Sequence, residues 1–244
     1  MTTMTWRQLR KKCKRESDYI ITLFVTNEVS LFLTWILNRT RVTPNHVTMA
    51  SVSCELFCAC LYASGHFMAG SLFYFLAHIL DCTDGNLARA KELFSPLGRW
   101  FDLVGDRLGE VFIFLGISFY FYSSGHGLSW TFIALLDALL ILLYYYIVDV
   151  GLSLGIAGPS QGLSSWKIKD VRVKWGLYEP VMYGLILLAP LGLLKLQLAL
   201  ILGLVLTGLV YQAQKNYRLF RSLEQTPDPC RLKASDTAPG PHDP

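Results

Sequence analysis

Four aspartates stand at spacings that could build one metal site. They form two pairs, Asp81 with Asp84 and Asp102 with Asp106. Residues three or four apart share one face of a helix, so each pair would project from one face if both segments are helical. Four carboxylates in one place repel one another unless cations neutralise them, and oxygen ligands favour hard divalent ions. The spacing therefore predicts a site for Mg²⁺ or Mn²⁺, with enough acids to hold two ions; a structural ion site or a proton relay is the alternative.

The composition places these acids in a membrane protein. Of the 244 residues, 52% are hydrophobic and only 16% are charged, whereas roughly 25% are charged in soluble domains. Three long segments each contain a single charged residue: 42–80, 111–148 and 181–214. Each is nearly twice the roughly 20 residues that cross a bilayer as a helix, and each has a small or polar break near its middle. The pattern predicts three helical hairpins, and therefore an all-α polytopic membrane protein with six transmembrane helices.

The length of the second helix puts its aspartates inside the bundle. Its apolar stretch, residues 68–80, has only 13 residues and is too short to span. The helix must therefore continue through the first aspartate pair to about residue 88. By the same reasoning, the third helix begins near Gly98 and carries the second pair in its first turns.

The basic residues predict the orientation. Every Lys and Arg except Lys195 falls in the first 42 residues, in or beside the loops after the second and fourth helices, or near the C-terminus. Because basic residues favour cytoplasmic loops, we expect a multi-pass protein with both termini in the cytoplasm. We expect no nucleic-acid partner.

The chain divides into three predicted parts. Residues 1–42 form a basic N-terminal segment, in which the apolar but interrupted stretch 19–37 predicts an amphipathic helix lying in the membrane interface. A seventh span is the alternative for that stretch. Residues 43–223 form the six-helix domain, and residues 224–244 form a proline-rich tail with too little apolar surface to fold.

The aspartates belong to a longer pattern. It reads Asp81-x2-Asp84-Gly85-x2-Ala88-Arg89-x8-Gly98-x3-Asp102-x3-Asp106. This pattern resembles the signature of the CDP-alcohol phosphatidyltransferase family, and every fixed position is matched. The resemblance implies an enzyme of phospholipid biosynthesis that moves a phosphatidyl group from a CDP-linked donor, CDP-diacylglycerol being the commonest, to an alcohol acceptor with release of CMP. It also implies a homodimer.

The resemblance further implies a role for each position. Asp81, Asp84 and Asp102 would be metal ligands, and Asp106 would lie near the metal and act as the general base on the acceptor hydroxyl. The residues implied for the CDP group are Asn45, Gly85, Ala88, Arg89, Ser95 and Gly98. Small residues would let the nucleotide approach the backbone, or would serve close helix packing. An arginine could fork onto the diphosphate.

A basic segment after the fourth helix could select the acceptor. Lys167, Lys169 and Arg172 stand close together there. They could recognise an anionic acceptor such as a sugar phosphate or polyol phosphate, or they could simply follow the preference of basic residues for the cytoplasmic side.

Two other classes of protein place acids at membrane depth. An intramembrane prenyltransferase uses Asp-rich Mg²⁺ sites for a diphosphate substrate, and an ion-coupled transporter could use the aspartates as an ion path. Neither produces CMP, so metal-dependent CMP release from a CDP-lipid would exclude both.

Overall fold

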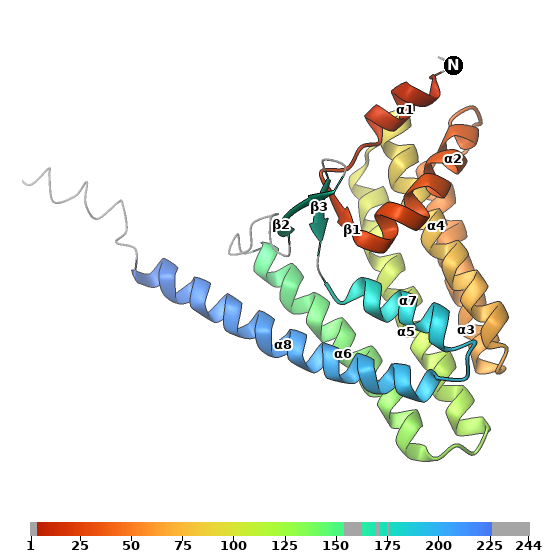
Figure 1. Cartoon of the computed structure of the whole chain (residues 1–244), viewed down its shortest axis with the longest axis vertical. Coiled ribbons are helices and arrows are strands. Elements are labelled where there is room, and N and C mark those ends of the chain that lie inside the picture. Colours follow the sequence, from red (N-terminus) through yellow and green to blue (C-terminus); the bar gives the residue numbers. More distant parts are fainter. Residues whose placement is uncertain (1–3, 154–162, 169–170, 175, 226–244) are drawn as a thin grey trace, which may run out of the picture.

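The computed structural model describes residues 4–153, 163–168, 171–174 and 176–225, most of them helical (Figure 1). The helices are α1 (Trp6–Lys12), the π-helix η1 (Thr22–Thr26), α2 (Asn27–Leu37), α3 (Pro44–Ala63), α4 (Phe67–Lys91), α5 (Pro96–Ser123), α6 (Leu128–Ser153), α7 (Tyr178–Leu188) and α8 (Leu194–Gln225). The strands are β1 (Ser17–Tyr19), β2 (Leu163–Ile168) and β3 (Val171–Lys174).

The two helices that carry the aspartates end and begin where the sequence indicates. Helix α4 continues past the first pair and stops at Glu92, whose φ of 57° lies in the left-handed region. Helix α5 begins at Pro96, directly after Ser95, whose Oγ accepts a hydrogen bond of 2.9 Å from the Gly98 N–H. Proline at the first position and serine before it are the residues that start helices. A short loop therefore joins the two acid-bearing ends.

Glycines let α5 lie directly against α3. A Cβ added at Gly116 would come within 2.2 Å of the Ala59 carbonyl oxygen, and one added at Gly105 would come within 2.7 Å of Val52 Cγ2. Any larger residue at these positions would push the helices apart. This close packing fixes the start of α5, with its aspartates, beside α3 and α4.

Helices α6 and α8 run side by side in the same direction (Figure 1). Near their starts, Lys195 Nζ lies 5.7 Å from the centre of the Trp130 ring; further along, Asn216 Nδ2 donates to the Ile147 carbonyl at 3.5 Å. The chain must therefore return to the starting end of α6 before α8 begins. Helix α7 lies on that return path, although its 11 residues measure only about 17 Å at 1.5 Å per residue.

Three of the described helices are long and apolar enough to cross a membrane. They cover residues 44–63, 128–151 and 194–221. Helices α4 and α5 have the length, but charged and polar residues at their acid-bearing ends lower their apolarity. These three helices are consistent with a helical membrane-type fold, and the six spans remain a prediction.

The expectation of an all-α chain is wrong in one respect, because the chain also contains a small three-stranded sheet. Strand β3 pairs in parallel with β1 and antiparallel with β2. In β3, Val171 and Val173 are buried whereas Arg172 is exposed, which is the period-two alternation of a strand. The sequence predicts a basic loop here, because the charges of this segment mask that short alternation.

The N-terminal segment contains the expected helix over most of residues 19–37, because η1 runs directly into α2 as one apolar helix, Thr22–Leu37. Residues 17–37 contain β1, η1 and α2 in succession, and α1 precedes them. At the other end, α8 extends to Gln225, past the predicted boundary at residue 223. The tail from residue 226 lies outside the described residues.

Candidate active site

Three of the four aspartates meet where α4 and α5 adjoin. The carboxylates of Asp81, Asp102 and Asp106 each offer one oxygen, and these oxygens all lie within 4.8 Å of one another. An all-oxygen set of negative groups at this spacing suits a hard divalent cation such as Mg²⁺ or Mn²⁺. The residues present therefore fit the metal that the sequence analysis expected.

The fourth aspartate stands apart from this cluster and is held by α3. Thr48 Oγ1 donates a hydrogen bond of 2.5 Å to Asp84 Oδ2, and both groups are buried. Asp84 is not among the three acids whose oxygens lie within 4.8 Å. Its side chain instead lines two cavities that meet at the aspartates.

These two cavities share one wall. The first cavity, of about 530 Å³, lies between the starts of α3 and α5 and the end of α4. The second cavity, of about 610 Å³, lies between α4, α5, α7 and the N-terminal segment. The residues that line both are Asp84, Gly85, Arg89 and Asp102. A molecule in either cavity would therefore reach Asp84 and Asp102.

All six residues expected to contact the CDP group line the first cavity. They are Asn45, Gly85, Ala88, Arg89, Ser95 and Gly98. A Cβ added at Gly98 would lie 2.8 Å from Asn45 Oδ1 and 2.9 Å from Ser95 Oγ, so only glycine lets these side chains come together there. The Ser95 hydroxyl also caps α5, a second function for this residue.

Arg89 lines both cavities and has hydrogen-bond donors that are not fully used. Its Nη2 donates to Asn86 Oδ1 at 2.9 Å. Its Nε is buried and has no hydrogen-bond partner in the described part of the chain. A buried guanidinium nitrogen without an acceptor is costly, so this side chain is suited to receive the oxygens of an anionic group.

The N-terminal segment supplies a wall of the second cavity that the sequence analysis missed. Arg15 lines this cavity, with Nη1 3.0 Å from Asp18 Oδ2 and Nη2 donating to the Cys82 carbonyl oxygen at 3.4 Å. The sequence shows the basic cluster around Arg15 as part of a basic N-terminal segment, without indicating what it faces. The pairing of β1 with β3, together with the contacts of Cys13 and Arg15 with α4, folds it back over the aspartates.

Tyr19 and Lys174 form the neighbouring part of that wall. Both line the second cavity, and Lys174 Nζ lies 5.9 Å from the centre of the Tyr19 ring. Burial raises the pKa of Tyr19 to about 12. The phenol is therefore neutral near pH 7, and the basic side chains of this wall keep their net positive charge.

His78 joins α4 to the N-terminal segment. Its Nε2 lies 3.3 Å from the hydroxyls of both Thr22 and Thr26 in η1, and its Nδ1 lies 3.0 Å from the Tyr178 hydroxyl. His78 could also join Asp81 and Cys82 around a metal ion. Because hydroxyl groups already occupy both ring nitrogens, we assign the metal to the all-carboxylate cluster instead.

Arg107 of α5 lines the second cavity and is paired with a neighbouring acid of its own helix. Arg107 Nη1 lies 2.7 Å from Glu110 Oε2, and its guanidinium carbon lies 3.5 Å from the centre of the Tyr145 ring. This arginine is therefore neutralised mainly by Glu110. The three carboxylates suit a bound cation, which would offset their mutual repulsion.

Of the three residues expected to bind the acceptor, only Arg172 has a described side chain, and it does not line the second cavity. Arg172 lies in β3 but is exposed and does not line the second cavity, whereas Lys174 does. Lys167 lies in β2, and its side chain is outside the described part of the structure. Lys169 also lies outside the described residues.

Comparison with known families gives a match over most of the chain. Residues 41–210 match the model of CDP-alcohol phosphatidyltransferases. A phosphatidylinositol phosphate synthase of Cutibacterium acnes is 32% identical over 96 residues, which are 39% of this chain and 46% of that protein. A bifunctional IPC transferase and DIPP synthase of Rubrobacter xylanophilus is 35% identical over 79 residues, 32% of this chain and 18% of that protein. The chain thus spans less than half the length of either curated relative.

Solved structures share the fold. The phosphatidylinositol phosphate synthase of Mycobacterium tuberculosis with CDP-DAG bound superposes with a TM-score of 0.61 at 17% identity, over 79% of this chain and 94% of that one. The same enzyme in complex with manganese and citrate gives a TM-score of 0.58 at 18% identity, over 79% and 89% of the two chains. At these identities the likeness concerns the architecture alone.

Proposed function

This chain belongs to the CDP-alcohol phosphatidyltransferase family, and on that basis we propose that it transfers a phosphatidyl group from CDP-diacylglycerol to a polar alcohol with release of CMP. One observation carries the proposal: the Asp81, Asp102 and Asp106 carboxylates lie within 4.8 Å of one another where two cavities meet. A donor diphosphate and an acceptor hydroxyl must both reach the same metal site, and this arrangement lets them do so.

The first cavity is the proposed binding site for the CDP group. It is lined by the small residues Gly85, Ala88 and Gly98, which leave space beside the backbone. Arg89 would hold the diphosphate, because a guanidinium can donate two parallel hydrogen bonds to phosphate oxygens. The related enzyme of Mycobacterium tuberculosis was solved with CDP-DAG bound, which supports this donor.

The aspartate cluster is the proposed site of one or two divalent cations. The proposed ligands are the three clustered acids and Asp84, that is, Asp81, Asp84, Asp102 and Asp106. Asp84 stands apart from the cluster but lines both cavities. Bound Mg²⁺ or Mn²⁺ would neutralise charge on the diphosphate during transfer. The manganese in the related structure supports a divalent ion here.

Asp106 is the proposed general base. Its carboxylate takes the proton of the acceptor hydroxyl, and the hydroxyl oxygen forms a bond to the β-phosphorus. The bond from that phosphorus to the bridging oxygen breaks, and the electron pair leaves with CMP. Asp106 lines the second cavity and not the first, so it faces the side from which an acceptor would enter.

We propose that the acceptor carries a negative charge. Lys14, Arg15 and Lys174 line the second cavity, and basic side chains in a concave site favour an anion. The curated relative from Cutibacterium acnes is named a phosphatidylinositol phosphate synthase, which agrees with a phosphorylated polyol. Lys167, Lys169 and Arg172 remain proposed contacts at the outer edge of this entrance.

The proposed topology has six spans and both termini in the cytoplasm. The ends of α3 and α5 lie together, because a Cβ at Gly65 would come within 3.1 Å of the Tyr120 ring. The parallel course of α6 and α8 requires one crossing between them, which we assign to α7 with its flanking residues. Two further proposals, a homodimer and an interfacial position for α2, follow the family resemblance and the apolar pattern of residues 19–37.

The test is metal-dependent CMP release from CDP-diacylglycerol by the purified protein. A panel of polyols and their phosphate esters serves as acceptors, and mass spectrometry identifies the lipid product. We expect a new phosphatidyl lipid and CMP in equal amounts, only with a divalent ion present. Absence of CMP with every acceptor would overturn the proposal and favour a prenyltransferase or an ion-coupled transporter instead. The variant Asp149→Asn, which changes an exposed acid of α6 outside both cavities, should stay fully active.

A further inference from the structure

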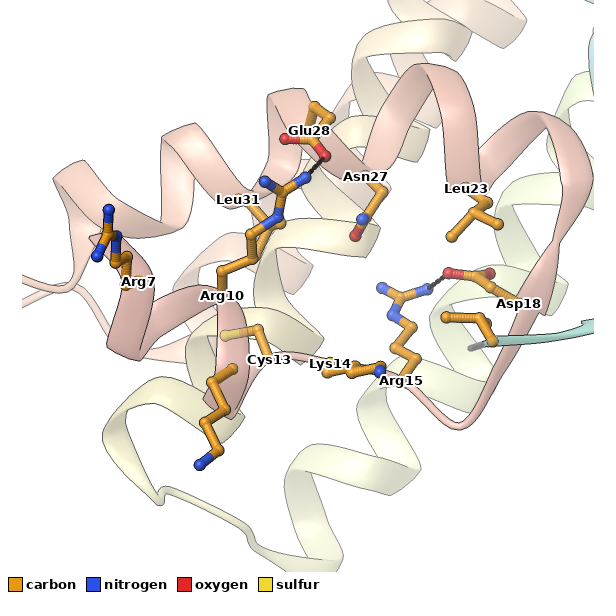
Figure 2. A pocket seen from close by; sticks show the side chains of 12 residues that line it. Arg7, Arg10, Cys13, Lys14, Arg15, Asp18, Leu23, Asn27, Glu28 and Leu31 are labelled. Atoms are coloured by element: carbon orange, nitrogen blue, oxygen red, sulfur yellow. Dashed lines mark hydrogen bonds and ion pairs between the residues drawn. The ribbon is translucent and has the colours of Figure 1, made fainter. Parts of the chain in front are cut away.

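A third cavity lies within the N-terminal segment. This N-terminal cavity, of about 410 Å³, opens between α1, the chain that follows it, η1 and α2 (Figure 2). All of its lining residues except Val171 come from positions 7–31. They precede residues 41–210, which match the family. The cavity is therefore an addition to the transferase domain and is separate from the metal site.

The lining is strongly basic. Its charged side chains are Arg7, Arg10, Lys11, Lys14, Arg15, Asp18 and Glu28. The two acids are already committed, because Glu28 forms an ion pair with Arg10 and Asp18 lies 3.0 Å from Arg15. Arg7 and Lys11 are exposed and have no acidic partner in the described part of the chain. Arg7 and Lys11 therefore give the cavity positive charge that no acid among the described residues neutralises.

The basic groups are held in place by the surrounding structure. Figure 2 shows the guanidinium groups of Arg10 and Arg15 on either side of Asn27, each bound to its carboxylate partner. Each guanidinium has five N–H donors, so one ion pair leaves others available. The Nε of Arg15 is buried and has no hydrogen-bond partner among the described residues. These donors are positioned for a ligand before it arrives.

Helix α1 is fixed against the end of α4, so the cavity is not a loose surface groove. Leu9 is 1% exposed, Cys13 Sγ donates to the Asn86 carbonyl oxygen at 3.3 Å, and Lys12 Nζ lies 2.7 Å from Glu92 Oε1. A basic stretch that only touched headgroups would need none of these contacts. They indicate a built concave site.

We propose that the N-terminal cavity binds a phosphate-bearing anion through Arg7, Arg10, Lys11 and Arg15. Arginine forks match phosphate oxygens, and Asn27 adds an amide donor. Leu23, Leu31 and Val171 give the cavity an apolar floor that suits the carbon skeleton of a phosphate ester. The ligand is either the phosphate headgroup of an anionic lipid or a soluble phosphate ester.

The site is placed to influence the transferase. Lys14, Arg15 and Asp18 line both the N-terminal cavity and the second cavity. An anion bound in the former would share Arg15 with whatever occupies the latter. Binding itself does not depend on the proposed reaction and can be tested without it.

The experiment titrates inorganic phosphate into the full-length protein by calorimetry, with chelator present so that no metal contributes. The protein is held in nanodiscs of phosphatidylcholine, with and without phosphatidic acid. We expect saturable binding in phosphatidylcholine discs. Phosphatidic acid should weaken the apparent affinity by competition if a lipid headgroup fills the cavity, and should leave it unchanged if the ligand is soluble.

Paired variants separate this site from general charge and from the second cavity. Arg7→Gln with Lys11→Gln changes two exposed residues that line only the N-terminal cavity, and should weaken phosphate binding at least about tenfold. Arg218→Gln with Arg221→Gln removes the same charge from exposed positions of α8 and should change it less than about twofold. No saturable binding to the wild type, unchanged affinity in the first variant, or equal loss in both would overturn the proposal.

Discussion

The Thr48 hydroxyl donates a hydrogen bond of 2.5 Å to Asp84 Oδ2, so α3 orients an acid carried by α4. Hydrogen bonds to ligand carboxylates typically change metal affinity by about 10–100-fold. Thr48→Val keeps the shape of the side chain and removes the hydroxyl. We expect the Mn²⁺ concentration for half-maximal CMP release to rise about tenfold, measured by metal titration.

The control for that variant is Thr207→Val. The Thr207 hydroxyl donates only to Gly203 and Leu204 carbonyl oxygens within α8, both at 2.9 Å. Its loss should leave the metal dependence unchanged. An equal shift in both variants would show that the Thr48 effect is not specific to Asp84.

Asp106→Asn should stop transfer while donor binding persists. The amide cannot accept the acceptor proton, and general bases contribute about 10²–10⁴-fold to the rate. We expect kcat to fall by at least about 10²-fold, whereas binding of CDP-diacylglycerol, measured by equilibrium filtration, changes little. Turnover near the wild-type level would show that another group is the base.

Much of this site follows from local sequence rules. The first aspartate pair had to lie in α4 because residues 68–80 alone cannot span, and α4 does run on to Lys91. The second pair was expected in a helix that begins near Gly98, and α5 begins at Pro96 with Ser95 as its cap. The convergence of Asp81, Asp102 and Asp106 then depends only on two neighbouring helices joined by a short loop.

The N-terminal wall could not be predicted in the same way. Arg15 is held at the second cavity by contacts that are distant in the chain. It donates to the Cys82 carbonyl oxygen, and the adjoining β1 pairs with β3 more than 150 positions away (Ser17 with Arg172). No periodicity within either segment encodes that contact. The sequence showed the positive charge, whereas only the tertiary fold shows that it faces the aspartates.

Gly98→Ala should impair the first cavity. The new Cβ would lie 2.8 Å from Asn45 Oδ1 and 2.9 Å from Ser95 Oγ, so these side chains or the start of α5 must move. Because small displacements in a binding site are costly, we expect the KM for the CDP-lipid to rise about tenfold. Gly203→Ala in α8 meets open space and should raise helix stability by about 1 kcal/mol without affecting KM.

Arg15→Gln should act on the acceptor alone. Losing a charged hydrogen-bond donor in the second cavity should raise the KM for a phosphorylated acceptor about tenfold and leave the KM for the CDP-lipid unchanged. The unphosphorylated parent alcohol, measured in parallel, should show no such change. Equal effects on both acceptors would remove the anion-binding role of Arg15, and Arg218→Gln in α8 provides the matched change of charge.

Removing the metal should destabilise the protein, and removing one of the repelling carboxylates should relieve that destabilisation. Carboxylate oxygens within 4.8 Å repel by about 3 kcal/mol per ionised pair at an effective dielectric constant near 20, and a bound cation relieves this. Chelator should therefore lower the melting temperature of the wild type, and Mn²⁺ should restore it by mass action.

The variant Asp102→Asn removes one of the charges, so its metal-free form should melt at or above the metal-free wild type. The rise in its melting temperature on adding Mn²⁺ should be smaller than in the wild type. Differential scanning fluorimetry in detergent measures both quantities, and Asp149→Asn should behave as the wild type does. If the metal-free Asp102→Asn protein melts well below the metal-free wild type, or gains as much from Mn²⁺, the cluster is not the cation site.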